Sequence, residues 1–200
     1  YRDAMLHFWH SISKTDVHYN GSFSTREAAG GNPYRPGHIE TCCTVAWIDY
    51  SIDALKLSKD ASIADRLELA LWNAVLAYEH PNGRWCTYDT PMDGYRLSAT
   101  QIIGSQARQG TPELNCCAVN GPRGLGLLSQ WAVLVDQAGV YLNYFGPGSL
   151  SFTTEDGVKW SLNQETEYPS DGRIVISLDL ENPVETTLFI RIPSWSVKTK

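Results

Sequence analysis

The chain carries little charge, and no part of it collects positive charge. Only 19% of its 200 residues are charged, below the roughly 25% usual for soluble domains, which argues for a sizeable core and against disorder. Lysine and arginine number 16 against 22 acidic residues, so the formal charge is −6. Without a basic cluster, the sequence has no footprint for nucleic acid or for an anionic membrane.

Long apolar runs, internal repeats and low-complexity segments are also missing. No run approaches the roughly 18 residues of a membrane span, which excludes a transmembrane helix in this stretch. Neither an initiator methionine nor a signal peptide precedes Tyr1. We therefore expect a piece of a longer protein, with little activity by itself, and the localisation stays open between cytoplasm and periplasm.

Helical spacing fills most of the first two-thirds of the chain. Apolar residues three and four positions apart predict a helix that ends near Lys14, and further helices over 41–59, 62–78 and 120–135. The segment 16–39 between the first two holds four glycines and two prolines. It predicts a loop of a length that is uncommon in compact domains and often functional.

Short alternating segments replace the helical pattern after Gln137. Five of them predict strands, with turns at Glu155-Asp-Gly157 and Ser170-Asp-Gly172. Strands at this spacing are typical of an antiparallel β-sandwich. We therefore expect a domain boundary between residues 137 and 138.

The sequence contains five cysteines, four of them in adjacent pairs: Cys42 and Cys43, Cys86, and Cys116 and Cys117. One interpretation is a set of buried thiols, which pack as small apolar side chains. The other is a metal site, because Glu40-Thr-Cys42 and Cys116-Cys117 each adjoin the start of a predicted helix, where thiolates are favoured. Three sulfurs and one carboxylate can complete a tetrahedral zinc site.

A thiolate beside zinc is also a candidate nucleophile where a substrate can reach it. Retaining glycosidases place a nucleophile and an acid/base carboxyl about 5 Å apart. Glu27 in the glycine-rich loop is the best-placed candidate for the acid/base. The alternative is a solvated carboxylate beside Arg26.

The order of these motifs resembles the β-L-arabinofuranosidases of glycoside hydrolase family 127. The likeness covers nearly the whole chain and rests on four features: Tyr19-Asn-Gly21 before the loop with Glu27, Glu40-Thr-Cys42 before an apolar helix, Cys116-Cys117 before Asn120 and a helix, and the closing segment 187–195.

The resemblance implies an α+β multidomain fragment. Residues 1–137 would be the later part of an (α/α)6 catalytic barrel, and residues 138–200 the start of an antiparallel β-sandwich. It further implies a retaining exo-glycoside hydrolase with a carbohydrate substrate. Its zinc ligands and catalytic residues would be Glu40, Cys42, Cys116 and Cys117, with Cys116 as the nucleophile and Glu27 as the acid/base.

Three further side chains are candidate sugar contacts, namely His38, Trp85 and Tyr88. The alternatives are a solvated histidine and two core aromatics. We expect Cys43 to face away from the site and Cys86 to be structural. Two other functions stay open: the same fold acting on a different glycoside, and a non-catalytic protein whose zinc only holds loops together. The sugar and the oligomeric state do not follow from the sequence.

Overall fold

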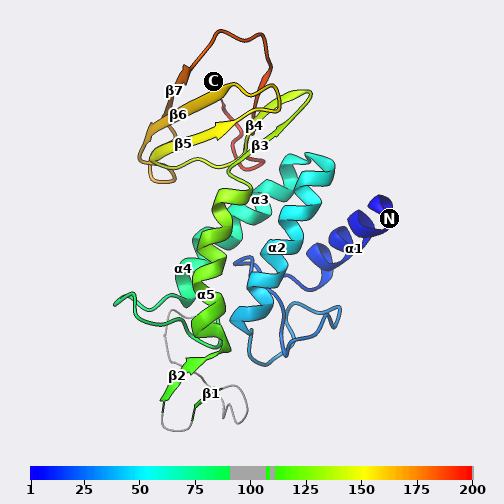
Figure 1. Cartoon of the computed structure of the whole chain (residues 1–200). Coiled ribbons are helices and arrows are strands. Elements are labelled where there is room, and N and C mark those ends of the chain that lie inside the picture. The colour runs from blue at the N-terminus through cyan, green and yellow to red at the C-terminus, as the bar shows by residue number, and fades with distance from the viewer. Residues whose placement is uncertain (91–106, 109–110, 200) are drawn as a thin grey trace. The chain divides into compact units, whose positions relative to one another are not determined.

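The computed structural model describes residues 1–90, 107–108 and 111–199 (Figure 1). The chain divides into two compact units, Tyr1–Leu128 and Ser129–Lys200, called the helical unit and the strand unit below. The two units differ in secondary structure as the change of pattern in the sequence predicts. The predicted domain boundary at 137/138 stays a prediction, because the division at 128/129 only marks where the contacts within each unit end.

Helices make up the core of the first unit, and their bounds are α1 (Arg2–Thr15), α2 (Thr41–Ser58), α3 (Ala61–Ala70), a π-helical turn (Leu71–Val75), α4 (Leu76–Tyr78) and α5 (Cys116–Gly126). Two short antiparallel strands, β1 (Ala107–Arg108) and β2 (Thr111–Asn115), precede α5. A 3-10 turn (Leu127–Gln130) follows α5. The first three predicted helices are confirmed, the third as one run through α3, the π turn and α4. No helix within the described residues has the length and apolar composition to cross a bilayer.

The fourth predicted helix, 120–135, is wrong at both ends. The helix starts earlier, at Cys116, because Asn115 caps it. It ends at Gly126, and Val133–Asp136 form strand β3 instead. Two β-branched valines in that segment and a turn before Gly139 favour pairing with the next strand over a further helical turn.

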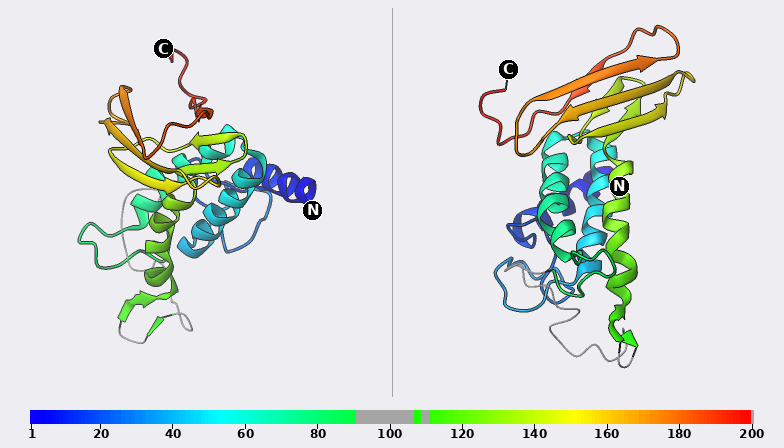
Figure 2. Two further views of the ribbon diagram at one scale, coloured as in Figure 1. Left: turned by 45° about the horizontal axis from the view of Figure 1, so that its top comes forward. Right: turned by 90° about the vertical axis from the view of Figure 1, so that its left-hand side faces the viewer.

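Helix α2 is the centre of the helical unit. It packs against α1, α3 and α5, and the views in Figures 1 and 2 agree on this side-by-side arrangement of α2, α3 and α5. Its apolar residues Val45, Ile48, Ile52 and Leu55 are all at least 97% buried, as their helical spacing predicts. Burying each of them stabilises the unit by about 1.5–3 kcal/mol, so the position of α2, and of the residues at its N-terminus, is fixed by the core.

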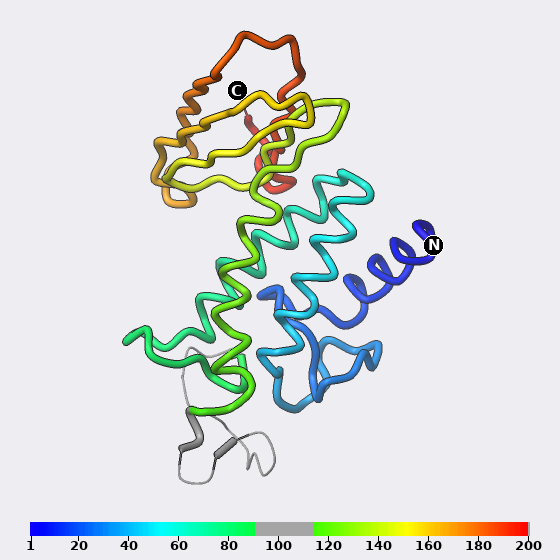
Figure 3. Tube along the Cα trace, viewed as in Figure 1, coloured from blue at the N-terminus to red at the C-terminus, as the bar shows by residue number. Residues whose placement is uncertain are grey.

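Figure 3 shows the course of the long loop between α1 and α2, and hydrogen bonds hold this loop at several points. Asp16 accepts hydrogen bonds from the backbone N–H groups of Gly30 at 2.5 Å and Gly31 at 2.7 Å. Thr25 pairs with Ile39 in an isolated bridge. The loop therefore has a fixed course although it contains no helix or regular strand.

The strand unit contains two three-stranded sheets. One has the order β3 (Val133–Asp136), β4 (Gly139–Leu142), β8 (Leu188–Ile190), and the other the order β5 (Gly148–Thr153), β6 (Lys159–Thr166), β7 (Ile174–Leu180). All five predicted strand segments are present. The expectation of antiparallel strands throughout is wrong for one pair, because β8 runs parallel to β4.

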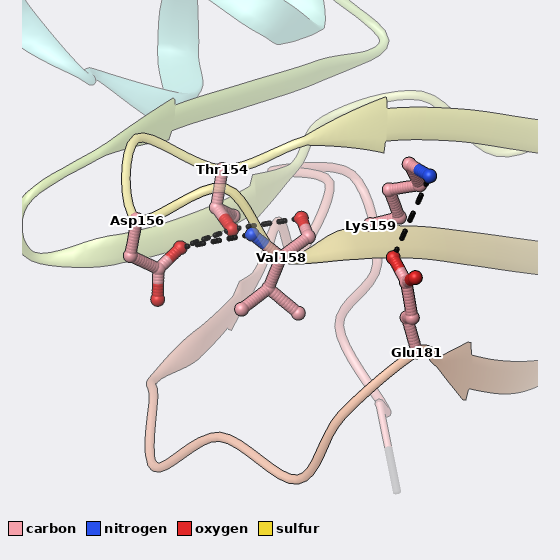
Figure 4. Close-up of polar contacts among 5 residues, drawn as sticks. All are labelled: Thr154, Asp156, Val158, Lys159 and Glu181. Atoms are coloured by element: carbon pink, nitrogen blue, oxygen red, sulfur yellow. Dashed lines mark hydrogen bonds and ion pairs between the residues drawn. The ribbon is translucent and has the colours of Figure 1, made fainter.

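The core of the strand unit is a cluster of Leu142, Phe145, Leu162 and Tyr168, against which side chains of both sheets pack. The predicted turn between β5 and β6 is confirmed, with Gly157 at φ +84°. Figure 4 shows how Asp156 holds it, accepting from the Thr154 hydroxyl and from the Val158 N–H. The nearby Lys159–Glu181 ion pair is exposed and adds little stability.

Candidate metal centre

The two cysteines at the start of α5 are placed by a capped helix N-terminus. The side chain of Asn115 accepts hydrogen bonds from the N–H groups of Cys117 at 2.9 Å and Ala118 at 3.1 Å. This cap sets Cys116 and Cys117 as the first two helical residues, with Cys117 fully buried and Cys116 partly exposed. A helix N-terminus also favours negative charge on these sulfurs.

The other two donors stand at the start of α2. Glu40 is the N-cap residue and has extended backbone geometry. It pairs with Asp89 in an isolated bridge, and the N–H of Thr41 donates to the carbonyl of Tyr88 at 2.8 Å. These contacts place the Glu40 carboxylate and the Cys42 thiol beside the start of α5.

Glu40, Cys42, Cys116 and Cys117 form one group, with a donor atom of each within 4.8 Å of all the others. The sulfur–sulfur distances run from 3.2 to 3.8 Å. The Glu40 Oε1 atom lies 3.7 Å from the Cys116 sulfur and 3.9 Å from the Cys117 sulfur. Zinc–sulfur bonds of about 2.3 Å in a tetrahedron separate two sulfurs by about 3.8 Å, so the group has the dimensions and donors that zinc requires.

Charge within the group is unevenly distributed. Hydrogen bonds with the Cys117 thiol and with the Asn120 amide, 3.3 Å from the Cys42 sulfur, together lower the pKa of Cys42 to about 7, although burial opposes them. Burial raises the pKa of Cys116 to about 11. Burial also raises the pKa of Glu40, and the charge of Glu27 adds to this. A divalent cation would supply the positive charge that lets all four donors ionise together.

Glu27 lies next to this group, as its effect on Glu40 indicates. The hydroxyl of Tyr88 donates to Glu27 Oε1 at 3.0 Å. Arg26 and Glu27 both have left-handed backbone geometry, with φ of 58° and 59°, which turns the exposed loop sharply at this point. The loop therefore brings a second carboxylate close to the four donors.

The three candidate sugar contacts have different surroundings. Tyr88 is buried and bonded to Glu27. His38 is partly exposed, and its carbonyl accepts from the N–H of Arg26. Trp85 stacks on His80, with ring centroids 4.2 Å apart, and lines a different cavity of about 120 Å³ that also borders Cys86.

The expectation that Cys43 faces away from the site is wrong. Its thiol donates to Glu40 Oε2 at 3.4 Å. Residues three positions apart share a helix face, so the spacing of Glu40 and Cys43 carried a signal for this contact. Burial raises the pKa of Cys43 to about 12, which keeps it a thiol at neutral pH. The sequence also did not predict that Asn120 contacts Cys42, although Asn120 belongs to the motif that follows Cys116 and Cys117.

The family models that match the chain describe two adjoining domains. The GH127 catalytic domain of β-L-arabinofuranosidases matches residues 1–129, and the GH127 middle domain matches residues 139–200. A comparison with curated proteins gives no match.

Solved structures of similar fold are longer than this chain. One, described as a glycoside hydrolase, is 26% identical with a TM-score of 0.72, over 95% of this chain and 35% of its own. Another is the crystal structure of Ara127N-Se, a GH127 β-L-arabinofuranosidase from Geobacillus stearothermophilus T6. It is 21% identical with a TM-score of 0.71, over 97% of this chain and 32% of its own, and shows the fold alone. The chain spans about a third of the length of each.

Proposed function

We propose, since the chain belongs to the GH127 β-L-arabinofuranosidase family, that it supplies the zinc site, nucleophile and acid/base of a retaining exo-glycoside hydrolase. The substrate would be a β-L-arabinofuranoside. The observation that carries this proposal is the meeting of Glu40, Cys42, Cys116 and Cys117, with Glu27 beside them. Three thiols and a carboxylate at tetrahedral spacing, next to a second carboxylate, suit a metal-held nucleophile and a proton donor.

The domain assignment forms part of the same proposal. Residues 1–137 would be the later helices of an (α/α)6 barrel, and residues 138–200 the first strands of a β-sandwich. The helical character of the first unit and the two sheets of the second support a helical domain followed by a strand domain, although strand β3 before residue 137 pairs with β4 of the second unit.

Bound zinc would keep the thiols ionised and fixed in orientation. Of the sulfurs, Cys117 is fully buried and Cys42 accepts a hydrogen bond from Asn120, whereas Cys116 is partly exposed at the helix N-terminus. Exposure favours Cys116 and the partly exposed Cys42 over Cys117, and the hydrogen bond from Asn120 to Cys42 leaves Cys116 as the sulfur proposed to meet the substrate.

In the first step the Cys116 sulfur attacks the anomeric carbon, so that a carbon–sulfur bond forms and the glycosidic carbon–oxygen bond breaks. Glu27 gives its proton to the departing oxygen. In the second step Glu27 takes a proton from water, and that water attacks the same carbon. The carbon–sulfur bond then breaks and Cys116 is restored as a thiolate, with net retention of configuration.

Tyr88 supports this assignment of Glu27, because its hydroxyl fixes one carboxyl oxygen. His38, Trp85 and Tyr88 stay proposed as sugar contacts. Of the three, only Tyr88 has support from a bond to a proposed catalytic group.

The test measures zinc content and hydrolysis on the same samples of the intact protein. Wild type is compared with Cys116→Ser and Cys117→Ser on p-nitrophenyl β-L-arabinofuranoside, with Cys86→Ser as a control outside the group. We expect one zinc per wild-type chain, no turnover by Cys116→Ser, weaker zinc binding by Cys117→Ser and neither defect in Cys86→Ser. Absence of zinc from the wild type would overturn the ligand assignment.

One observation favours a second function. Four protein donors complete a tetrahedral site, which is typical of structural zinc. Zinc without hydrolysis of any glycoside would support a non-catalytic role. Hydrolysis of a glycoside other than an arabinofuranoside would keep the mechanism and change only the substrate.

A further inference from the structure

The two carboxyl oxygens of Glu40 face different sulfurs, and this division assigns a role to Cys43. Oε1 lies 3.7 Å from the Cys116 sulfur and 3.9 Å from the Cys117 sulfur. Oε2 lies 3.4 Å from the Cys43 sulfur. One oxygen is thus directed at the proposed ligand group and the other at a thiol outside it.

Both oxygens of a carboxylate are able to ligate, and a side chain with one oxygen unoccupied rotates between arrangements. Glu40 also has Glu27 as a neighbour, whose negative charge acts on its carboxyl group. A fixed donor at Oε2 removes this freedom. Such outer contacts orient metal ligands, and losing one typically costs 10–100-fold in metal affinity.

We propose that Cys43 is a positioning residue whose thiol donates to Glu40 Oε2 and thereby holds Oε1 toward the other donors. The inference rests on the zinc site of the proposed function. Cys43 stands three residues after Glu40 in the first turn of α2, so the helix backbone itself fixes the spacing of the pair. It lies outside the four-donor group, which separates its role from that of a ligand.

Three substitutions separate hydrogen bonding from bulk. Cys43→Ser keeps a donor, Cys43→Val keeps bulk without a donor, and Cys43→Ala removes both. Cys86→Ala is the control, since Cys86 is likewise a free cysteine and lies outside the four-donor group. Each variant is made in the intact protein, and its folding is followed by circular dichroism.

The first readout is the zinc dissociation constant from competition with a chromophoric chelator. We expect Cys43→Val and Cys43→Ala to bind zinc about 10–100-fold more weakly than wild type, and Cys43→Ser to stay within a few-fold. The control should bind like wild type. Ser keeps the donor and Val keeps the bulk, so a role in hydrogen bonding and a role in packing predict opposite orders for this pair, which decides the matter even if Cys43→Ala does not fold.

The second readout is the absorption spectrum of the cobalt-substituted protein. We expect all variants to keep the sulfur-to-cobalt charge-transfer intensity of three thiolates. The d–d bands should shift in Cys43→Val and return toward wild type in Cys43→Ser, because those bands report ligand geometry.

Two outcomes overturn the role of Cys43. Equal zinc affinity in wild type and Cys43→Val, with unchanged d–d bands, leaves it only a packing role. Loss of charge-transfer intensity in both Ser and Val makes it a ligand. Wild-type protein that binds no zinc overturns the proposed site itself and this inference with it, so the two failures are told apart.

Discussion

Some buried polar side chains are used differently in the two units, although Asp16 and Asn115 of the helical unit also bond to the backbone. In the strand unit they bond to the backbone: Arg191 Nε donates to the Asn143 carbonyl at 2.6 Å, and the Asn143 amide donates to the Trp131 carbonyl at 3.1 Å. In the helical unit they face one another, as the contacts of Glu40 with Cys43 and Cys116 do. A side chain bonded to backbone stabilises a fold, whereas side chains that converge can bind and react.

The largest effect should come from Glu27→Gln in the intact protein. The amide that replaces the carboxyl group cannot transfer a proton, so kcat/KM for the aryl arabinofuranoside should fall by about 10²–10⁴-fold. Zinc content and thermal stability should stay at wild-type values. The matched control is Glu155→Gln, which removes an exposed carboxylate from the strand unit and should leave activity unchanged. Equal activities in the two variants would contradict the assignment of Glu27.

Arg191→Met should lower stability and leave activity unchanged, the reverse of Glu27→Gln. Arg191 is 95% buried and its guanidinium also lies over the Phe145 ring, 5.2 Å from the centroid. Removing the charged donor leaves the Asn143 carbonyl without this partner, so the free energy of unfolding should fall by about 2–3 kcal/mol. Urea unfolding measures this loss, while kcat/KM per folded molecule should hold. A lower kcat/KM with unchanged stability would break the comparison between the units.

Tyr88→Phe tests a bond between side chains in the helical unit. Without the hydroxyl, Glu27 loses a partner at 3.0 Å and samples more orientations. We expect kcat/KM to fall about tenfold, equivalent to about 1.4 kcal/mol, with a shifted basic limb in the pH profile, because the first step needs the protonated acid. Tyr141→Phe, which removes the hydroxyl of a partly exposed side chain in the strand unit, is the control. If both variants keep the wild-type pH profile, Tyr88 does not position Glu27.

The smallest effect concerns pH and stability. All five histidines precede residue 129, so the strand unit has none. Burial lowers the folded-state pKa of His18, whose Nε2 lies 3.1 Å from the Thr25 hydroxyl. The unfolded chain therefore takes up a proton first as pH falls below about 6.5, and stability decreases there. His18→Gln should make the free energy of unfolding, measured in urea, fall less steeply with decreasing pH. An unchanged pH dependence would contradict the role of His18.

Most helix bounds could be predicted because their signals are local. Apolar spacing fixes the core face of α2, and Asp60, which accepts from the N–H of Ser62, begins α3 close to the predicted start. Strand β3 could not be predicted in this way. Trp131 and Leu134 have helical spacing, and only pairing with β4 makes Val133–Asp136 extended. The parallel pairing of β8 with β4 likewise depends on segments far apart in sequence.

In the candidate site, too, local features could be predicted from the sequence and contacts between distant segments could not. The Glu40–Cys42 and Cys116–Cys117 motifs are local, and the order of motifs along the chain indicated that they belong together. Cys43 is three residues from Glu40, so its contact could have been predicted from helix geometry. The bond from Tyr88 to Glu27 joins residues 61 positions apart, and no periodicity carries such information.

The way Asp16 holds the long loop has a consequence for engineering. Its bonds to Gly30 and Gly31, together with the Thr25–Ile39 bridge, hold the stretch around Glu27 from both sides. Gly37 has a φ of +145°, and a Cβ on it would meet Thr25 at 2.8 Å and Arg26 at 2.9 Å. Residues 34–36, between the anchors at Gly31 and Ile39, are exposed. Their length and composition can thus vary while the carboxylate keeps its position, which separates the part of the loop open to redesign from the part that carries the chemistry.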